Sequence, residues 1–419
     1  MEDGKTKLKL CIVSTGDYFS NYGGGEVYVR NIVDGFHSMR FDRCIEMFVL
    51  QSGQKLQMRE HGGIKIYDIG NQNDAYTVLS AEHPDIVHAN GLFETIVPTC
   101  RLLGIKCVVT IHDCMYICPV YTHIDYRDRL CSKPMAINNC LRCYLKKIKF
   151  GKAFSPVVKN IADEKYIQLG RWLDTKPFVL LATPIGQAAL KIQNKVDYWN
   201  DNICSADRVI LLSNRMVRAA ISNGLNPSKI KLIPNGIPEP DVDTAFPSAE
   251  KSVKFYYVGR VCYSKGVHIL LSAFKNIKLD NCELHIIGDD NNDYSSRLKK
   301  KHSSDKRIVW HGVVEHNELM NLAKHFHVMV HPSIGNECCP LSIAEALSIG
   351  KCVIATKCGG PEDQIIDGEN GWLVEPNNVG ELTKAMSDFI EKPSSPRMIK
   401  YVTLEEHLGQ LMQTYEEIV

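Results

Sequence analysis

Short apolar runs alternate with amphipathic stretches along most of this chain. The runs at 7–14, 46–50, 64–69, 85–89 and 107–111 have the length and apolar character typical of buried strands. Helical spacing lies between several of them, for example over 27–36. Because strands that alternate with helices form parallel sheets, this pattern predicts an α/β protein.

The alternation breaks once and then resumes. Residues 114–202 carry a cysteine cluster and then a long, mostly helical, lysine-rich piece. The strand–helix rhythm returns at 208–233 and ends in a proline-rich linker, 234–240. A second series follows, with strands expected at 254–258, 283–287, 307–310, 328–331 and 352–356, and helices at 267–275 and 318–325. The tail from about Met398 reads as one last helix.

Two α/β series on either side of a linker predict two Rossmann-like domains with parallel sheets that face each other across a cleft. A chain of 419 residues has the length of two or three domains, and the pattern favours two. The first is expected to comprise 1–238, with an insertion over about 114–202, and to be completed by 398–419. The second comprises 239–397. Ligands in such sheets bind at the carboxyl ends of the strands.

Charge and composition add little to this picture. The chain has 49 Lys and Arg against 48 Asp and Glu, which gives no whole-chain case for nucleic acid or membrane binding. No apolar run reaches membrane-spanning length, and the first ten residues, MEDGKTKLKL, lack a signal core. We therefore expect a cytoplasmic protein. A run of lysines, Lys146, Lys147, Lys149, Lys152 and Lys159, suits either a solvated helix face or peripheral contact with an anionic membrane surface.

The stretch from His331 to Val374 carries two carboxylates, Glu337 and Glu345. Glu337 is expected in a loop, and Pro340 is expected at the first position of a helix that contains Glu345. Helix N-termini bind anions, so an anionic ligand beside a fixed carboxylate is the hypothesis. The alternative for Glu345 is an ordinary exposed helix residue.

Three further groups follow predicted strands. Gly23, Gly24 and Gly25 form a loop that either cradles a phosphate or is a flexible turn, and it is neither GxGxxG nor a Walker loop. Arg260 and Lys265 would clamp a diphosphate, or are two solvated cations. His112 ends a strand, where a histidine suits a cleft role or a structural one. For His331 the structural role is favoured.

Cysteines cluster in the inserted segment. Cys118, Cys131, Cys140 and Cys143 have the spacing C-x12-C-x8-C-x2-C, and Cys114 is a spare candidate ligand. Four thiolates suit a structural zinc ion with no open position. Free thiols are the alternative. An iron–sulfur cluster is a minor option, and a disulfide does not suit a reducing cytosol.

Taken together, these motifs resemble the retaining, nucleotide-sugar-dependent glycosyltransferases of the GT-B fold known as family 4. The resemblance covers nearly the whole chain. It rests on GGGE at Gly23–Glu26, TIHD at Thr110–Asp113, IPNGI at Ile233–Ile237, GRVCYSKG at Gly259–Gly266, HPS at His331–Ser333, E-x7-E at Glu337–Glu345, GGPE and ENGWLV. The cysteine segment from His112 to Cys143 is similar to an insertion found in a subset of that family.

The resemblance implies a hexosyltransferase that moves a hexose from a nucleotide-diphosphate sugar to a glycan or lipid-linked acceptor. It implies that Arg260 and Lys265 bind the donor diphosphate, that Glu337 and His112 contact the donor sugar, and that Glu345 binds the ribose. The Gly23–Gly25 loop would close on the phosphates. The backbone amides of Cys339, Leu341 and Ser342 would contact sugar and phosphate. No catalytic metal is expected, and the last helix would cross back to the first domain.

Two positions depart from the family pattern. Pro340 stands where many relatives have glycine, and proline has no N–H to offer a ligand. The loop after Ile287 reads GDD, so Asp289 or Asp290 would repel or reorient a donor group.

Other functions remain as alternatives. A non-catalytic, zinc-stapled nucleotide-sugar-binding or assembly subunit would be expected to lose Glu337, Arg260 or Lys265, and all three are present. A phosphorylase would need a pyridoxal phosphate lysine, for which no feature argues, and a nucleotide-sugar epimerase is a further GT-B chemistry. A dinucleotide oxidoreductase would need GxGxxG in the first turn.

Overall fold

The computed structural model describes residues 7–19, 23–38, 45–127, 129–147, 165, 168–169, 172, 184–240, 252–397 and 400–419. Within these ranges the chain forms two compact units. Unit 1 comprises Met1–Arg127, Cys131–Asn235 and Leu404–Val419, and Gly236–Thr403 form most of unit 2.

Unit 1 is built on an eight-stranded sheet in the order β3-β4-β2-β1-β5-β6-β7-β8. All neighbouring strands are parallel except β3 and β4, which are antiparallel. The central strands β1, β5 and β6 are mostly apolar and buried because both faces of the sheet are covered. The strands are β1 Leu8–Ser14, β2 Ile45–Ser52, β3 Gln57–His61, β4 Ile64–Ile69, β5 Ile86–Ala89, β6 Lys106–Ile111, β7 Arg208–Leu211 and β8 Ile230–Leu232.

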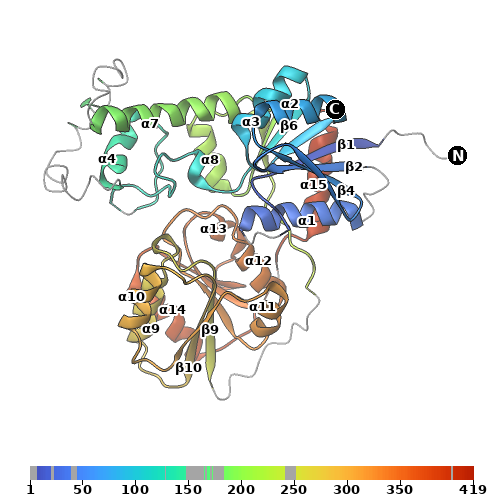
Figure 1. The fold of residues 1–419 in the computed structure, drawn as a ribbon. Coiled ribbons are helices and arrows are strands. Elements are labelled where there is room, and N and C mark those ends of the chain that lie inside the picture. Colours follow the sequence, from blue (N-terminus) through green and yellow to red (C-terminus); the bar gives the residue numbers. More distant parts are fainter. Residues whose placement is uncertain are drawn as a thin grey trace. The chain divides into compact units, whose positions relative to one another are not determined.

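Helices cover both faces of this sheet, and Figure 1 shows α1 below it and α2 and α3 above it. The described helices of unit 1 are α1 Gly24–Ser38, α2 Gln72–Glu82, α3 Phe93–Leu103, α4 Ile137–Lys147, α7 Pro184–Tyr198, α8 Asn214–Ser222 and α15 Leu404–Glu416. In the inserted segment, α4 and α7 pack together around Ile137, Leu141 and Ile192. The expectation of a mostly helical insertion covers these two helices, while Lys149, Lys152 and Lys159 lie outside the described residues.

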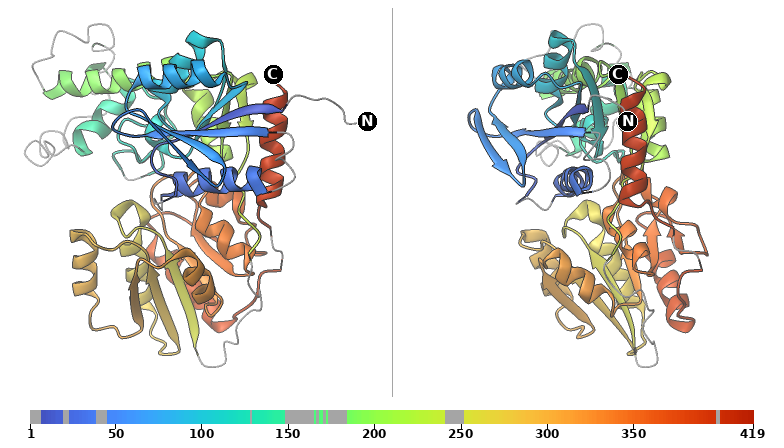
Figure 2. Two further views of the ribbon diagram at one scale, coloured as in Figure 1. Left: turned by 45° about the vertical axis from the view of Figure 1, so that its right-hand side comes forward. Right: turned by 90° about the vertical axis from the view of Figure 1, so that its right-hand side faces the viewer.

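The last helix, α15, packs on α1 of unit 1, as the sequence predicted (Figures 1 and 2). Gly35 of α1 makes this close approach possible, since a Cβ there would lie 2.6 Å from Leu408 Cδ1. Two buried histidines fix the helix further. His407 Nδ1 lies 2.8 Å from the Pro234 carbonyl oxygen, and the Tyr415 hydroxyl lies 2.7 Å from His88 Nδ1.

Unit 2 contains a six-stranded, fully parallel sheet in the order β11-β10-β9-β12-β13-β14. Its strands are β9 Val253–Val258, β10 Cys282–Ile287, β11 Ile308–Gly312, β12 Val328–His331, β13 Cys352–Thr356 and β14 Gly371–Val374. Its helices are α9 Val267–Asn276, α10 Asp293–Lys301, α11 His316–Ala323, α12 Leu341–Ser348, α13 Gly360–Gln364 and α14 Val379–Glu391. Two Rossmann-like units therefore confirm the predicted α/β class.

Strand order locates the crevice of each sheet. In unit 2 the chain moves outward from β9 to β11 and then returns to β12 on the other side of β9. In unit 1 the corresponding reversal falls between β1 and β5. Ligands bind outside the carboxyl ends of the strands at such a switch point. Ligand-binding residues are therefore expected directly after β9 and β12 in unit 2, and directly after β1 and β5 in unit 1.

Several boundaries differ from the sequence expectations. Helix α1 begins at Gly24, so two of the three loop glycines lie in its first turn. Pro340 is the N-cap of α12, with ψ of 117°, and Leu341 is the first helical residue. The last helix begins at Leu404 rather than near Met398, which lies outside the described residues. Strand β3 was not expected, because it has no alternating apolar pattern and its residues are mostly exposed.

No helix among the described residues is long and apolar enough to span a membrane.

Candidate active site

The loop after β9 holds the predicted diphosphate clamp against the loop after β12. Gly266 has a φ of +69°, and a Cβ at this position would lie 1.9 Å from the Pro332 carbonyl oxygen. The backbone N–H groups of Ile334 and Gly335 donate to the Ser264 carbonyl oxygen at 2.9 and 3.1 Å. Only glycine permits this approach, so the GRVCYSKG and HPS motifs meet at the switch point.

Glu337 lies at this junction and makes hydrogen bonds to three segments, which follow β9, β12 and β13. Lys265 Nζ lies 2.8 Å from its Oε1 and 2.9 Å from its Oε2. The Ser333 hydroxyl donates to Oε1 at 2.6 Å. The main chain is fixed as well, because Glu337 N–H donates to Cys358 O at 2.8 Å and Gly360 N–H donates to Glu337 O at 2.7 Å. The carboxylate is therefore held in place before any ligand arrives.

Both members of the Lys265–Glu337 pair remain charged. Burial raises the pKa of Glu337, but the Lys265 ammonium and the nearby His331 ring outweigh it, so this pKa lies well below its usual range. Burial lowers the pKa of Lys265, but the Glu337 carboxylate outweighs it, and this pKa lies above its ordinary value. The two side chains are only 25% and 15% exposed, so solvent screens the pair weakly.

His331 ends β12 with its ring buried beside Glu337. Its Nε2 lies 3.8 Å from Glu337 Oε1, and neither ring nitrogen hydrogen-bonds to any residue that the structure describes. The sequence favoured a structural role for this histidine. Its position next to the carboxylate adds it to the candidate site, and its place at the end of a strand and in the HPS motif were the signals for this.

Arg260 follows β9 with an exposed side chain. Its carbonyl oxygen accepts a hydrogen bond of 2.8 Å from the Tyr257 hydroxyl, which fixes its backbone. Its guanidinium makes no hydrogen bond or ion pair with the described residues. The two cations of the predicted diphosphate clamp therefore differ. Lys265 is hydrogen-bonded to Glu337, whereas the N–H donors of Arg260 are available to a ligand.

The N-terminus of α12 lies next to this cluster in the chain. Cys339 is buried, Leu341 and Ser342 are partly exposed, and Pro340 offers no side-chain cap. The first N–H groups of a helix lack intrahelical partners, so those of Leu341 and Ser342 are suited to an anion. A Cβ at Gly360 would lie 2.3 Å from the Cys338 carbonyl oxygen, which shows how closely α13 approaches this turn.

Glu345 lies inside α12 rather than in the loop. Its side chain is 19% exposed and 3.8 Å from His316 Nδ1. Burial raises its pKa, and the neighbouring His316 opposes this shift. It is therefore not an ordinary exposed helix residue, and it does not pair with Glu337.

The loop after β10 carries the two acidic residues of the GDD sequence. The negative charge of Asp290 is neutralised by an ion pair, because its Oδ2 lies 2.6 Å from Lys299 Nζ.

In unit 1 the glycine-rich segment begins α1. Gly23 accepts a hydrogen bond from Val27 N–H at 2.9 Å, and Gly23 and Gly24 are exposed. The Thr15 hydroxyl, just after β1, donates to Glu26 Oε1 at 2.9 Å. Helix α1 thus presents an exposed first turn at the carboxyl end of β1, with Glu26 beside it.

His112 follows β6 and faces the same switch point. Its Nε2 lies 3.0 Å from Asn90 Oδ1, after β5, so Nε2 carries the hydrogen and Nδ1 can accept. Its ring packs on that of Tyr28 at 4.6 Å. Burial, and then the neighbouring His407, lower the pKa of His112 to about 3. This histidine is neutral near pH 7. No sequence pattern had marked Asn90 or Tyr28 as site residues.

A lysine in α7 was also missed. Lys195 Nζ lies 5.4, 5.6 and 5.1 Å from the ring centres of Tyr116, Tyr121 and Tyr198. Tyr116 and Tyr121 are more than 70 positions before Lys195 and Tyr198 of α7, so only the folded insertion brings the two pairs together.

The four predicted zinc ligands lie near one another. Burial raises the pKa of the Cys140 thiol to about 12, and the thiols of Cys118, Cys143 and Cys131 add to this shift. However, the described residues contain no group of three or more His, Cys, Asp or Glu side chains arranged to hold a metal ion. The thiols as they stand do not fit a metal, and zinc remains a prediction.

Comparison with known proteins places this geometry in context. Residues 240–404 match the family described as "Glycosyl transferases group 1". Among curated proteins, the chain is 24% identical over 208 residues to the lipopolysaccharide 1,2-N-acetylglucosaminetransferase of Salmonella typhimurium, which covers 43% of this chain and 54% of the relative. The chain spans about half the length of the curated relatives it matches.

Solved structures match over almost the whole chain. Sucrose-phosphate synthase from Thermosynechococcus elongatus superposes with a TM-score of 0.66 at 15% identity, over 98% of this chain and 99% of that one. HepE from Anabaena, solved in complex with UDP-glucose, gives a TM-score of 0.64 at 18% identity, over 98% and 100%. The chain therefore has the GT-B glycosyltransferase fold, and its residues 240–404 match the group 1 glycosyl transferases.

Proposed function

We propose that this protein is a retaining glycosyltransferase that moves a hexose from a nucleotide-diphosphate sugar to a glycan or lipid-linked acceptor. The observation that carries the proposal is Glu337, held by Lys265 and Ser333 at the switch point of unit 2 beside the uncapped N-terminus of α12. A fixed carboxylate, two cations and free backbone N–H groups are what a sugar diphosphate needs.

Each residue has a role in this proposal. Arg260 and Lys265 bind the diphosphate, and the N–H groups of Leu341 and Ser342, with the backbone of Cys339, contact phosphate and sugar. Glu337 accepts hydrogen bonds from donor sugar hydroxyls near the reacting carbon. Glu345 binds the ribose hydroxyls. In unit 1, the exposed turn at Gly23–Gly25 approaches the phosphates, and neutral His112 contacts the sugar through Nδ1.

The reaction that these groups support breaks the bond between the anomeric carbon and the diphosphate oxygen. The electron pair leaves with the diphosphate, and Arg260 and Lys265 stabilise the charge that develops there. The acceptor hydroxyl oxygen attacks from the same face and forms the new glycosidic bond. Its proton passes to the departing phosphate oxygen, so the anomeric configuration is retained.

The comparisons support a substrate class for this proposal. HepE binds UDP-glucose, which favours a uridine-diphosphate hexose. The Salmonella relative acts on lipopolysaccharide, which favours a glycan or lipid-linked acceptor. We further propose a cytoplasmic protein that contacts an anionic membrane surface, to which an acceptor of that kind would be attached.

A transfer assay tests this function. Purified protein is incubated with UDP-glucose, GDP-mannose or ADP-glucose and a lipopolysaccharide core acceptor, and nucleoside diphosphate release and the product anomer are measured. We expect an α-linked product from one α-linked donor. Glu337→Ala should lower the rate at least about 100-fold. Glu391→Ala, which removes an exposed carboxylate at the end of α14, should leave the rate unchanged. An inverted product would refute the retaining mechanism.

A further inference from the structure

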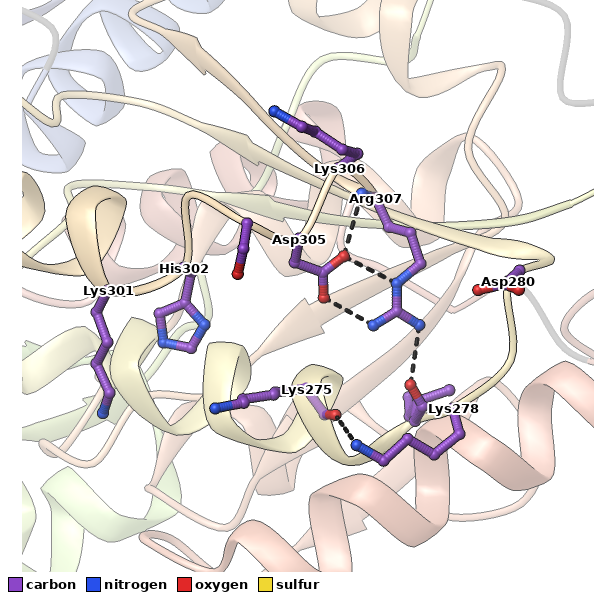
Figure 3. A pocket seen from close by; sticks show the side chains of 10 residues that line it. Lys275, Lys278, Asp280, Lys301, His302, Asp305, Lys306 and Arg307 are labelled. Atoms are coloured by element: carbon purple, nitrogen blue, oxygen red, sulfur yellow. Dashed lines mark hydrogen bonds and ion pairs between the residues drawn. The ribbon is translucent and has the colours of Figure 1, made fainter.

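A second polar site lies at the opposite edge of the unit 2 sheet. A pocket of about 460 Å³ is lined by the segments that lead from α9 into β10 and from α10 into β11. Figure 3 shows its side chains. Because these segments precede parallel strands, they lie at the amino edge of the sheet. Arg260 and Glu337 follow strands and lie at the carboxyl edge, so the two sites are separate.

Arg307 connects the two segments that line this pocket through hydrogen bonds. Its Nε and Nη2 donate to Asp305 Oδ1 and Oδ2 at 2.9 and 2.7 Å. Its Nη1 donates to the carbonyl oxygens of Ile277 and Leu279 at 2.9 and 2.8 Å. One guanidinium thus ties the two lining segments together. The N–H donors of Arg307 are already hydrogen-bonded, and its charge is neutralised by Asp305. These two residues therefore shape the pocket and are not the groups that would bind a charged ligand.

The remaining charge is positive. Five basic and two acidic side chains line the pocket, and Asp305 is occupied by Arg307. Lys278 Nζ donates to the Lys275 carbonyl oxygen at 3.3 Å. The ammonium groups of Lys275 and Lys301 have no hydrogen bond or ion pair with the residues described. Figure 3 shows Lys301, His302 and Lys275 along one side of the pocket, while Lys306 extends away from it.

His302 gives this cluster its specific feature. Its side chain is buried, with the residue only 6% exposed, and its Nε2 finds no hydrogen-bond partner among the described residues. Burial, then Lys301 and Lys275, lower its pKa, and Asp305 opposes them. Lysines at helix C-termini also stabilise the helix dipole, which accounts for Lys275 and Lys301. The helix dipole does not explain why the buried Nε2 of His302, close to these two lysines, has no hydrogen-bond partner.

We propose that this pocket binds the phosphate group of a small phosphorylated metabolite. Lys275 and Lys301 supply the charge, and His302 donates from Nε2 to a phosphate oxygen. A dianion there would balance two unpaired ammonium groups and satisfy the buried nitrogen. The proposal does not depend on glycosyl transfer, because none of its residues belongs to the carboxyl-edge site.

The buried histidine favours a small molecule over a membrane surface. A flat array of lipid headgroups would be bound by exposed lysines, including Lys300 and Lys306, without entering the pocket that His302 lines. A single phosphate group that enters the pocket contacts the ring and the two lysines together. The two cases therefore differ in which lysines matter and in whether His302 responds.

Calorimetric titration with inorganic phosphate and with glucose 6-phosphate, against sodium chloride of equal ionic strength, tests the proposal. We expect both phosphates to bind, with Lys275→Met and Lys301→Met each weakening binding about tenfold. Lys300→Met removes the same charge from the neighbouring position of α10 outside the pocket, and should leave affinity unchanged. All three lysines are exposed, so these variants should fold.

Proton NMR of the His302 ring gives an independent readout. A bound anion favours the charged imidazolium, so phosphate should raise the pKa of His302. Equal weakening by Lys300→Met would overturn the proposal, because it would indicate diffuse surface attraction. Binding only to phosphatidylglycerol vesicles, no binding beyond that of chloride, or an unchanged His302 pKa at saturating phosphate would overturn it as well.

Discussion

Lys265 and Glu337 form an ion pair in which one ammonium group lies 2.8 and 2.9 Å from the two carboxylate oxygens. The residues are 72 positions apart and follow different strands, β9 and β12. A donor diphosphate would meet Lys265 already oriented by Glu337, so the cation is positioned in advance. The pair is therefore both a structural link and part of the proposed donor site.

Glu337→Ala should destabilise unit 2 as well as abolish transfer. The substitution leaves the largely buried Lys265 ammonium without its partner. We expect a loss of about 2 kcal/mol in the free energy of unfolding, less than the roughly 3–5 kcal/mol of a fully buried pair, because Lys265 is 25% exposed. Urea denaturation of the purified variant measures this loss.

The double variant provides the control for that measurement. If the two charges stabilise each other, Glu337→Ala with Lys265→Met should cost less than the sum of the single losses. Strict additivity would contradict the coupling.

Gly266→Ala should separate the two loops of the site. A Cβ there would meet the Pro332 carbonyl oxygen at 1.9 Å, and its φ of +69° disfavours a side chain. We expect a loss of about 3 kcal/mol or more, with weaker donor binding. Gly409→Ala in α15, where a Cβ meets nothing within 4 Å, should instead stabilise by about 0.5–1 kcal/mol. A thermal melt of each variant distinguishes the two, and a neutral Gly266→Ala would refute the close approach.

Much of the fold could be predicted from the sequence, because buried parallel strands have short, nearly continuous apolar sequences. The runs that became β1, β6 and β13 are apolar almost throughout. The misses have local causes. Strand β3 pairs only with β4 and its residues are mostly exposed, so it lacks an alternating pattern. Helix α1 starts at Gly24 because the helix dipole and Glu26 outweigh the low helix propensity of glycine.

The site was readable only in part. Arg260, Lys265 and Glu337 each follow a strand, and that position, together with the motifs that contain them, marked them. Their pairing depends on strand order, which no single stretch of sequence encodes. Ser333 was noticed only as part of the HPS motif, and Asn90 and Lys195 lacked any signal, since each acquires its role from residues that the fold brings close.

Acid should destabilise unit 1 through its buried histidines. Burial lowers the pKa of His88 to about 3 and that of His407 to about 4, against an ordinary value near 6.5. Below about pH 6.5 the unfolded chain binds protons that the folded chain does not. The free energy of unfolding should therefore fall by up to about 1.4 kcal/mol per histidine per pH unit, until the folded pKa is reached.

Melting curves between pH 7 and 4 check this dependence. His407→Gln should reduce the pH slope by about one proton, and Gln410→Ala, an exposed position of the same helix with no titrating side chain, should not change it. An unchanged slope in His407→Gln would show that His407 is charged in the folded protein.

The cysteine spacing predicts near-stoichiometric zinc in the purified protein. Metal binding would require the thiols of Cys118, Cys131, Cys140 and Cys143 to lose their protons and draw together. Elemental analysis of the protein and of Cys140→Ser measures the metal. Cys204→Ser, outside the cluster, is the matched control. Metal-free protein, or zinc unaffected by Cys140→Ser, would refute the cluster as a zinc site.

The central claim is that unit 2 binds a nucleotide-diphosphate sugar through Arg260, Lys265 and Glu337. A thermal-shift series with UDP-, GDP- and ADP-sugars tests it directly, with Arg260→Ala beside the unchanged protein and Arg297→Ala, on the exposed surface of α10, as control. We predict that one nucleotide sugar raises the melting temperature of the unchanged protein and of Arg297→Ala, and that Arg260→Ala loses most of this rise. No stabilisation by any of the sugars, or an equal rise in all three proteins, would contradict the claim.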